Sequence, residues 1–179
     1  MRIVSGSARG LKLLSLEGDN TRPTTDRVKE ALFSIIQFNI YDSVVLDLFS
    51  GSGALGIEAL SRGAKCCDFV DNHKPACDII EQNLKRANLE DKAELHFKEA
   101  KDFLCNCSKK YDIIFLDPPY NKGLCMWAVN EICNLSLIKD NGIFVCETSA
   151  EEVIDVKNAK RKEYGKIAVT VIKREELPV

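Results

Sequence analysis

The chain has 179 residues, of which 45% are hydrophobic and 29% are charged, as in ordinary globular proteins. No stretch is apolar for long enough to cross a bilayer, and the N-terminal residues lack the apolar centre of a signal peptide. The length suits one domain, residues 1–179, in which residues 1–22 form an N-terminal hairpin extension and residues 23–179 form the core. We therefore expect a cytoplasmic monomer that makes no contact with a membrane.

The charge is low overall but unevenly distributed. A formal net charge of −2 and a pI of about 5.8 argue mildly against a general nucleic-acid binder, which usually carries a basic excess. Residues 1–16, however, contain no acidic side chain. The basic side chains in and shortly after this segment are Arg2, Arg9, Lys12, Arg22 and Arg27. Charge alone leaves two alternatives open, a surface that contacts phosphates and an ordinary solvated face.

The eight cysteines do not indicate disulfides or a metal site. Most of them lie in apolar stretches, where cysteine packs as a small hydrophobic side chain, and no two form a C-x-x-C pair. We therefore expect reduced thiols and no bound metal.

The first part of the chain predicts a hairpin and a helix. Residues 2–4 and 11–14 are strand-like and are separated by a glycine-bounded turn, Gly6 to Gly10. After a polar loop, residues 26–38 carry an apolar stripe of Val28, Leu32 and Ile35 or Ile36 at helical spacing.

Strand-like and helix-like segments then alternate. Strands are predicted at residues 44–46, 66–70, 93–97, 111–116 and 143–146. Helices are predicted at residues 54–61, from Pro75 to Ala87, around Ala100 to Leu104, and along a face of Leu124, Ala128, Ile132 and Leu135. In the tail, residues 153–156 and 167–172 are predicted to pair as an antiparallel edge. This alternation is typical of a mostly parallel α/β sheet, in which ligands bind at the carboxyl ends of the strands.

A glycine loop follows the first of these strands. Gly51, Gly53 and Gly56 satisfy the G-x-G-x-x-G pattern of dinucleotide-binding folds, so that alternative must be considered. Asp47, just before the loop, argues against it, because a carboxylate there would repel a pyrophosphate. It suits the ammonium group of S-adenosylmethionine instead, and this favours a methyltransferase loop over a dinucleotide site or a purely structural turn.

Acidic side chains also follow the next two strands. Asp71 could bind both ribose hydroxyls of a nucleoside, but Asp71 or Asn72 could equally cap the helix that begins near Pro75. After the third strand, Glu99 and Ala100 could meet an adenine edge, although an acid is also ordinary in the first turn of a helix.

The sequence Asp117-Pro118-Pro119-Tyr120 gives the strongest chemical signal. Two prolines after a buried strand stiffen the backbone, and this fixes the Asp117 carboxylate and the Pro118 carbonyl. Two such acceptors can hold the hydrogens of an exocyclic base amine and expose its lone pair to a methyl donor, while Tyr120 stacks on the base. The base must leave its stack to reach such a pocket. The structural alternative is a strand-terminal turn with a capping aspartate.

Three segments together resemble a known family. The run from Arg22 to Glu30 (RPTTDRVKE), the run from Asp47 to Leu60 (DLFSGSGALGIEAL) and the D-P-P-Y motif are similar to the RsmD-type guanine N2-methyltransferases of small-subunit ribosomal RNA. Residues 2–4 and 8–10 match that family's opening hairpin. This resemblance implies a Rossmann-like S-adenosylmethionine-dependent methyltransferase fold, with a mostly parallel seven-stranded sheet, an antiparallel edge and an N-terminal β-hairpin. Glu99 departs from the family, in which Asp is usual.

The resemblance also implies S-adenosyl-L-methionine as the donor and an assembling or assembled ribosomal small subunit as the partner. The predicted cofactor-binding residues are Asp47, Phe49, Gly51, Gly53, Asp71, Asn72, Glu99, Ala100 and Asp117. The predicted catalytic residues are Asp117, Pro118 and Tyr120. The predicted substrate-binding residues are Arg2, Arg9, Arg22, Thr25, Arg27, Pro119 and Tyr120.

Three rival functions remain at this point. A DNA adenine-N6 or cytosine-N4 methyltransferase shares the D-P-P-Y motif, but the short chain has no evident target-recognition domain. A nicotinamide-dependent oxidoreductase would use the glycine loop, and a cofactor-free RNA-binding module would use the basic segment. Neither of the last two explains D-P-P-Y.

Overall fold

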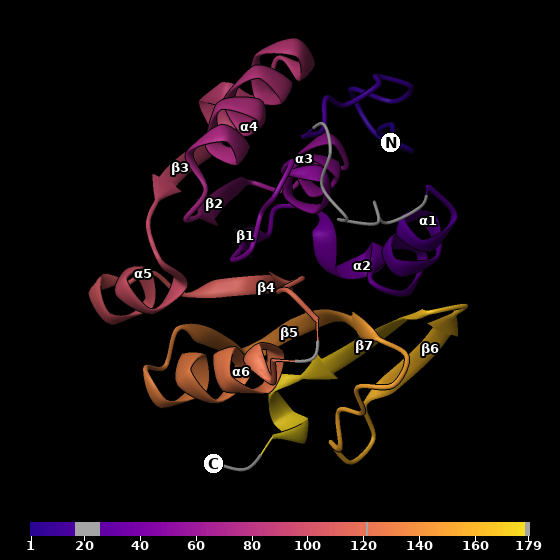
Figure 1. The fold of residues 1–179 in the computed structure, drawn as a ribbon, viewed down its shortest axis with the longest axis vertical. Helices are drawn as coiled ribbons and strands as arrows, with labels where there is room; N and C mark the ends of the chain where they lie inside the picture. The colour runs from indigo at the N-terminus through magenta and orange to yellow at the C-terminus, as the bar shows by residue number, and fades with distance from the viewer. Residues whose placement is uncertain (17–25, 121, 178–179) are drawn as a thin grey trace.

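The computed structural model describes residues 1–16, 26–120 and 122–177, and its centre is a seven-stranded sheet in the order β3-β2-β1-β4-β5-β7-β6 (Figure 1). The strands are β1 (Val44–Asp47), β2 (Cys66–Asp71), β3 (Ala93–Phe97), β4 (Tyr111–Leu116), β5 (Ile138–Ser149), β6 (Lys160–Tyr164) and β7 (Ile167–Lys173). The first five are mutually parallel, whereas β7 is antiparallel to both of its neighbours. The predicted mostly parallel sheet with an antiparallel edge is confirmed.

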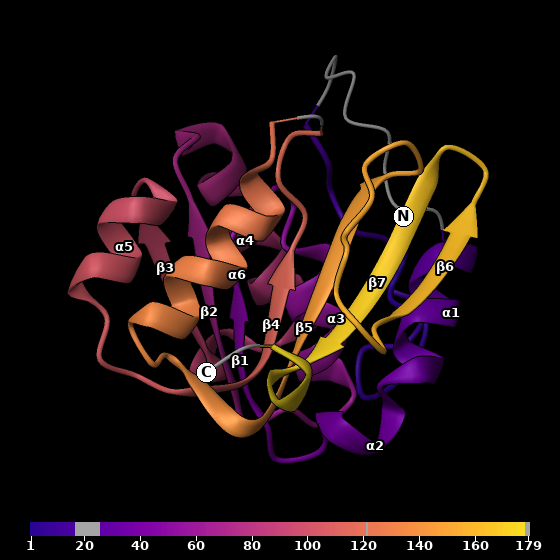
Figure 2. The ribbon, with the colours of Figure 1, turned by 90° about the horizontal axis from the view of Figure 1, so that it is seen from below.

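Helices cover both faces of this sheet (Figure 2). They are α1 (Asp26–Ile35), α2 (Gln37–Ile40), α3 (Ala54–Ser61), α4 (Lys74–Ala87), α5 (Ala100–Asn106) and α6 (Leu124–Asn134), with 3-10 turns η1 (Glu90–Lys92) and η2 (Arg174–Glu176). Helices α1 to α4 share one hydrophobic core with the sheet, and α5 and α6 share a second core on the opposite face. Among the described residues, none of the helices combines the length and the apolar character that a membrane span requires.

The central part of the chain folds as its periodicity predicts. Helix α3 occupies residues 54–61, and α4 buries Ala76, Ile80, Leu84 and Ala87, as expected from the sequence. In α6 the stripe differs, because Cys125 and Val129 are buried with Ala128 and Ile132 whereas Leu135 is exposed.

The predicted helix at residues 26–38 is wrong in its continuity. The helix is interrupted at Ile36, between α1 and α2. Both Ile36 and Ile40 are buried in the core, whereas Phe38 is 93% exposed.

The predicted edge strand at residues 153–156 is also wrong. Val153 is 71% exposed, and the strand that pairs with β7 is β6, whose sequence is mostly charged. Charged side chains are common on edge strands because they discourage pairing with other chains.

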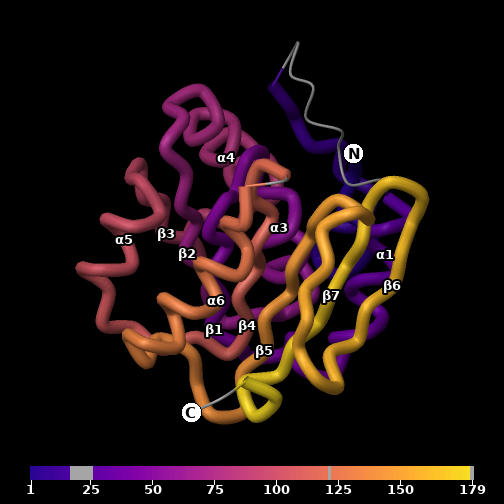
Figure 3. Tube along the Cα trace, turned by 60° about the horizontal axis from the view of Figure 1, so that its bottom comes forward, coloured from indigo at the N-terminus to yellow at the C-terminus, as the bar shows by residue number. Residues whose placement is uncertain are grey.

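The predicted N-terminal hairpin is present in a short form: its arms share one β-bridge, between Arg2 and Lys12, and are joined by backbone hydrogen bonds from Ile3 to Leu11, from Gly10 to Ile3 and from Leu13 to Met1. The backbone amides of Val4 and Ser5 donate to the two carboxylate oxygens of Glu58 in α3, at 2.8 and 3.0 Å. The segment therefore lies beside α3 (Figure 3), where the Ile3 side chain is completely buried.

A buried ion pair fastens the same segment to two helices. Lys29 of α1 and Glu58 of α3 are both fully buried, and the Lys29 Nζ lies 3.1 Å from Glu58 Oε2. Lys29 also donates to the carbonyl of Arg2 at 2.6 Å, and Arg62 donates to Glu58 Oε1 at 2.7 Å. Burial lowers the pKa of Lys29, while Glu58 acts in the opposite direction. Each charge is thus compensated by several partners.

We expect Lys29→Met to lower the free energy of unfolding by about 3 kcal/mol, because it leaves the buried Glu58 carboxylate without one of its two cations. Urea unfolding followed by circular dichroism measures this change. The matched control is Lys85→Met, which breaks the exposed Lys85–Glu81 pair and should leave the unfolding midpoint unchanged. Equal midpoints for the two variants would contradict the role given to the buried pair.

Candidate functional site

The sheet register places four acidic side chains at one end of the parallel strands. Asp47 of β1 is in register with Phe69 of β2 and with Phe115 of β4, which in turn is in register with Val145 of β5. Since side chains alternate along a strand, residues two positions further lie on the same sheet face. These residues are Asp71, Asp117 and Glu147. The strand ends therefore form a row of carboxyl groups, which we call the carboxylate row.

Asp47 is the most buried predicted ligand-binding acid in this row. It is 1% exposed, and its Oδ2 accepts a hydrogen bond from the backbone amide of Gly56, in the first turn of α3, at 3.0 Å. Burial raises the pKa of Asp47 to about 7; the Gly56 hydrogen bond partly offsets this rise, and Asp71 adds to it. A cation next to Asp47 would favour its ionised form and relieve the cost of burying the charge.

The glycine loop is held by hydrogen bonds to the ends of β1 and β2. The Ser50 hydroxyl donates to the Asp47 carbonyl at 2.6 Å and accepts from the Val70 amide at 3.0 Å. The Gly51 amide donates to Asp71 Oδ2 at 2.8 Å. Gly51 and Gly53 both have positive φ angles, and open space surrounds the position of a Cβ on Gly51. The loop backbone is thus accessible to a ligand at that point.

Gly56, the third glycine of the pattern, has a packing role. A Cβ at this position would lie 2.3 Å from the Phe69 ring, so only glycine lets α3 approach β2 this closely. This packing requirement explains why residue 56 is a glycine, so the third glycine of the pattern does not indicate a bound dinucleotide.

The Asp71 carboxylate accepts hydrogen bonds from two backbone amides, although within the described residues no side chain caps α4 at its N-cap residue, His73. Asp71 Oδ1 accepts from the His73 amide at 2.9 Å, just before α4, and its Oδ2 accepts from Gly51. The side chain therefore ties the glycine loop to the start of α4. Each carboxylate oxygen has a further lone pair, so contact with a ligand is compatible with these bonds.

The residues after β3 lie close to those after β2. The Asn72 side-chain amide donates to Glu99 Oε1 at 2.9 Å, and both side chains are exposed. Ala100 is half-buried at the start of α5, and Phe49 is half-buried in the glycine loop. The structure thus joins Asn72 and Glu99 in one polar group beside the carboxylate row.

The D-P-P-Y segment leaves β4 at the centre of the row. Asp117 is half-buried, Pro118 is buried and Pro119 is exposed. Tyr120 donates a hydrogen bond from its hydroxyl to Glu147 Oε1 at 3.1 Å. Burial raises the pKa of Asp117 well above its usual range, and Glu147, Asp47 and Cys125 add to this rise.

The predicted substrate-binding arginines do not form a group like the carboxylate row. Arg2, Arg9 and Arg27 are exposed, and Arg2 forms an ion pair with Asp26 at 3.2 Å. Arg22 and Thr25 lie outside the described residues.

The predicted site omits two buried residues, Glu147 and Asn83. Glu147 directly follows the predicted fifth strand, so the rule that identified the other three acids would have found it. Asn83 of α4 donates to the carbonyls of Leu14 and Ser52 and accepts from the Leu14 amide, which connects the N-terminal segment to the glycine loop. A buried asparagine in a helix carries no sequence signal for such a link.

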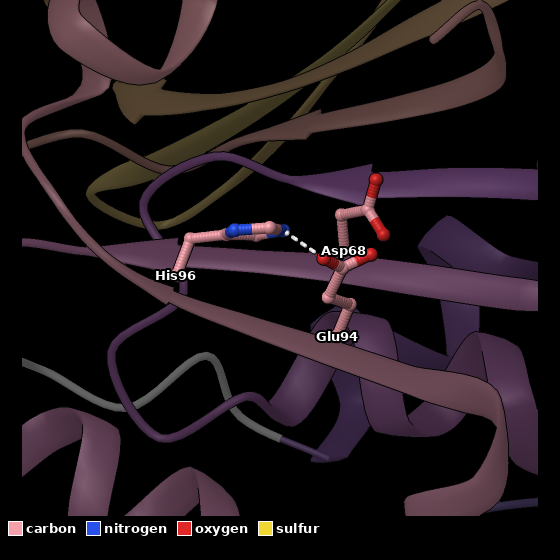
Figure 4. A group of neighbouring side chains, drawn as sticks. All are labelled: Asp68, Glu94 and His96. Atoms are coloured by element: carbon pink, nitrogen blue, oxygen red, sulfur yellow. Dashed lines mark ion pairs between the residues drawn. The ribbon is translucent and has the colours of Figure 1, made fainter.

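A second acidic group lies away from the row, on β2 and β3. Asp68, Glu94 and His96 point toward one another, with the ligand atoms of all three within 4.8 Å (Figure 4). Asp68 already accepts from Lys109 at 2.8 Å and from the Tyr111 hydroxyl at 2.6 Å. The Lys109 ammonium already supplies a positive charge to Asp68 and would repel a metal ion there, so we describe this group as a polar cluster paired with Lys109.

Comparison with known proteins assigns the family. A family model described as Conserved hypothetical protein 95 matches residues 1–173. The ribosomal RNA small subunit methyltransferase D of Haemophilus influenzae is 37% identical, over 85% of this chain and 80% of that protein. The chain belongs to the RsmD family.

Other members of the RsmD family agree over nearly the whole length. The methyltransferase D of Escherichia coli is 32% identical, over 98% of this chain and 90% of that protein. The solved structure of the Escherichia coli protein yhhF is 32% identical, covers 99% of both chains and superposes with a TM-score of 0.87. The predicted family and the predicted methyltransferase fold are therefore confirmed.

The pKa of Asp47 leads to a prediction about stability in this RsmD-family chain. Between about pH 4 and pH 7 the folded protein holds a proton on Asp47 that the unfolded chain has released. The contribution of this group to the free energy of unfolding therefore falls as the pH rises through that window and is constant above it. Across the window we expect the wild type to lose up to about 4 kcal/mol more than Asp47→Asn.

Urea unfolding at several pH values measures the difference. The Asp47→Asn substitution removes the titratable group and keeps the hydrogen bond, because the amide oxygen of the new side chain can still accept from the Gly56 amide. The exposed Asp78→Asn variant in α4 is the control and should follow the wild type. Parallel pH profiles for the wild type and Asp47→Asn would contradict the assignment.

Proposed function

We propose that the chain transfers a methyl group from S-adenosyl-L-methionine to the exocyclic N2 of a guanine in small-subunit (16S) ribosomal RNA. One observation carries this proposal. Asp117, the first residue of the D-P-P-Y segment, lies in the same carboxylate row as the buried Asp47, which ends β1 just before the glycine loop. Amine acceptors and a site suited to a cation are thus neighbours.

The residues at β1 and β2 fit the methyl donor better than a dinucleotide. A buried carboxyl with a pKa of about 7 favours a cationic ligand and opposes a pyrophosphate. The open space at Gly51 leaves the loop backbone accessible. Asp47 and the loop would hold the amino-acid moiety, and Asp71 and Asn72 the ribose. When bound, S-adenosylmethionine supplies a methyl group on a positively charged sulfur.

The D-P-P-Y segment supplies the groups that act on the base. The Asp117 carboxylate and the Pro118 carbonyl accept hydrogen bonds from the two amine hydrogens, which draws the lone pair out of the ring system. The following proline keeps the Pro118 carbonyl fixed. Asp117 then takes the proton that the amine loses. Tyr120 stacks on the base and is steadied by its bond to Glu147.

The substrate follows from the family and from exposed basic side chains. Relatives that are 32–37% identical are named for methylation of small-subunit ribosomal RNA. The exposed Arg2, Arg9 and Arg27 can contact RNA phosphates in an assembling or assembled subunit. The modest net charge is consistent with a substrate that presents its target in a structured particle. We further propose that the protein acts as a cytoplasmic monomer.

The nature of the product tests this proposal. Small subunits from a strain lacking the gene are incubated with the purified protein and S-adenosylmethionine, and the nucleosides are then analysed by mass spectrometry. We expect N2-methylguanosine in RNA. Formation of N6-methyladenine or N4-methylcytosine in a parallel DNA reaction, without methylated guanosine in RNA, would overturn the proposed substrate.

A pair of variants tests the division of roles. Asp47→Ala should weaken binding of S-adenosylmethionine at least about 10-fold, because the cationic head group loses its partner. Asp117→Asn should lower kcat at least about 100-fold with little change in donor affinity. Calorimetry gives the affinity and a single-turnover assay gives the rate. Full activity in Asp117→Asn would refute the role of that residue.

A further inference from the structure

Glu147 is a buried acid to which the motif assigns no role. It is 1% exposed and lies near the end of β5, between β4 and β7 in the sheet. Its neighbour Cys146 is in register with Leu116, so Glu147 and Asp117 are the next residues along two paired strands. The Tyr120 hydroxyl donates to its Oε1 at 3.1 Å. Glu147 therefore adjoins both ends of the D-P-P-Y segment.

We propose that Glu147 is a positioning residue of the D-P-P-Y site, which places a second carboxylate beside Asp117 and orients the Tyr120 ring through its hydroxyl. This inference rests on the proposed function, in which Asp117 and Tyr120 act on the base. It adds that Glu147 further raises the proton affinity of the buried Asp117 and does so without touching the base.

The methyl-transfer step explains why such a neighbour is useful. The bond from the methyl carbon to sulfur breaks, its electron pair stays on sulfur, and the amine lone pair forms the new carbon–nitrogen bond. The nitrogen then carries a positive charge and loses one proton to the Asp117 carboxylate. A second carboxylate beside Asp117 makes it a better proton acceptor, because repulsion between like charges favours the protonated form.

The surroundings of Asp117 support this coupling. The titratable groups that act on it are Glu147 from β5, Asp47 from β1 and Cys125 from α6. Burial is the largest cause of its raised pKa, and Glu147 is the largest of the three neighbouring groups. A cationic donor at Asp47 would offset part of this repulsion, which leaves Glu147 as the neighbour that keeps the Asp117 pKa high.

The decisive variant is Glu147→Gln, which keeps an acceptor for Tyr120 and removes the charge. We expect the Asp117 pKa to fall by about one unit or more. Carboxyl carbon NMR of the full chain measures it, with the Asp117 signal identified by its loss in Asp117→Asn. The acid limb of the kcat–pH profile should move to lower pH by a similar amount. The exposed Glu151→Gln is the matched control and should change neither.

Two further variants separate charge from hydrogen bonding. Glu147→Asp keeps the charge on a side chain that is shorter by one methylene, so the charge lies farther from Asp117. The Asp117 pKa in this variant should lie between those of the wild type and Glu147→Gln. Tyr120→Phe removes the hydroxyl bond and should raise KM for RNA several-fold while leaving the acid limb in place. If Glu147→Gln fails to fold, Glu147→Asp carries the test.

An unchanged Asp117 pKa in Glu147→Gln, or in Glu147→Asp when the first variant does not fold, would overturn the inference. The NMR titration needs no methyl transfer. A shifted pKa in a protein that does not methylate guanosine would therefore contradict the proposed function and leave the coupling of the two carboxyl groups standing.

Discussion

The burial of several acidic groups beside one another in the carboxylate row is the constraint on which the rest of this site depends. Parallel strands bring their carboxyl ends to one edge of the sheet, and here Asp47, Asp71, Asp117 and Glu147 lie at or next to the ends of four of those strands. Asp47 and Glu147 are almost completely buried. Such a row is stabilised by bound protons or by a positively charged ligand. Burial is the largest cause of the raised pKa values of Asp47 and Asp117, and repulsion from neighbouring acids adds to it.

Elsewhere the fold compensates its buried charges internally. Glu58 forms ion pairs with Lys29 and Arg62 and accepts hydrogen bonds from two backbone amides. Asp68 forms an ion pair with Lys109 and accepts a hydrogen bond from the Tyr111 hydroxyl. Within residues 1–16, 26–120 and 122–177, by contrast, Asp47 accepts a single hydrogen bond, from the backbone amide of Gly56. In the described part of the chain, Asp47 thus differs from Glu58 and Asp68, which are paired with cations, and this difference supports the assignment of Asp47 to ligand binding.

The N-terminal segment is connected to this site through buried contacts. Glu58 and Lys29 fasten its first residues to α1 and α3, and Asn83 joins Leu14 to the carbonyl of Ser52 in the glycine loop. A segment that carries the exposed Arg2 and Arg9 is therefore fixed to the element proposed to hold the donor. In our account this arrangement couples the position of bound RNA to the position of the methyl group.

Much of the fold could be predicted because hydrophobic periodicity reports burial directly. The central strands and α3 and α4 follow it closely, and Asp47, Asp71 and Asp117 were found because each ends an apolar strand. Glu147 directly follows the predicted fifth strand in the same way, and it was omitted although the same rule applies to it. Periodicity also failed where a charged residue is buried, as at Lys29, and where an edge strand is charged, as in β6. In such places tertiary contacts, which a single sequence does not reveal, decide the structure.

The central claim is that the buried Asp47 carboxyl binds the cationic group of S-adenosylmethionine. Proton release on binding of this ligand tests it most directly. Calorimetric titration near pH 7, in two buffers of different ionisation enthalpy, gives the number of protons exchanged. A cationic ligand beside Asp47 should lower its pKa from about 7, so binding should release a measurable fraction of a proton and strengthen as the pH rises. Binding without proton release in the wild type, or tight binding of NAD in place of S-adenosylmethionine, would contradict it.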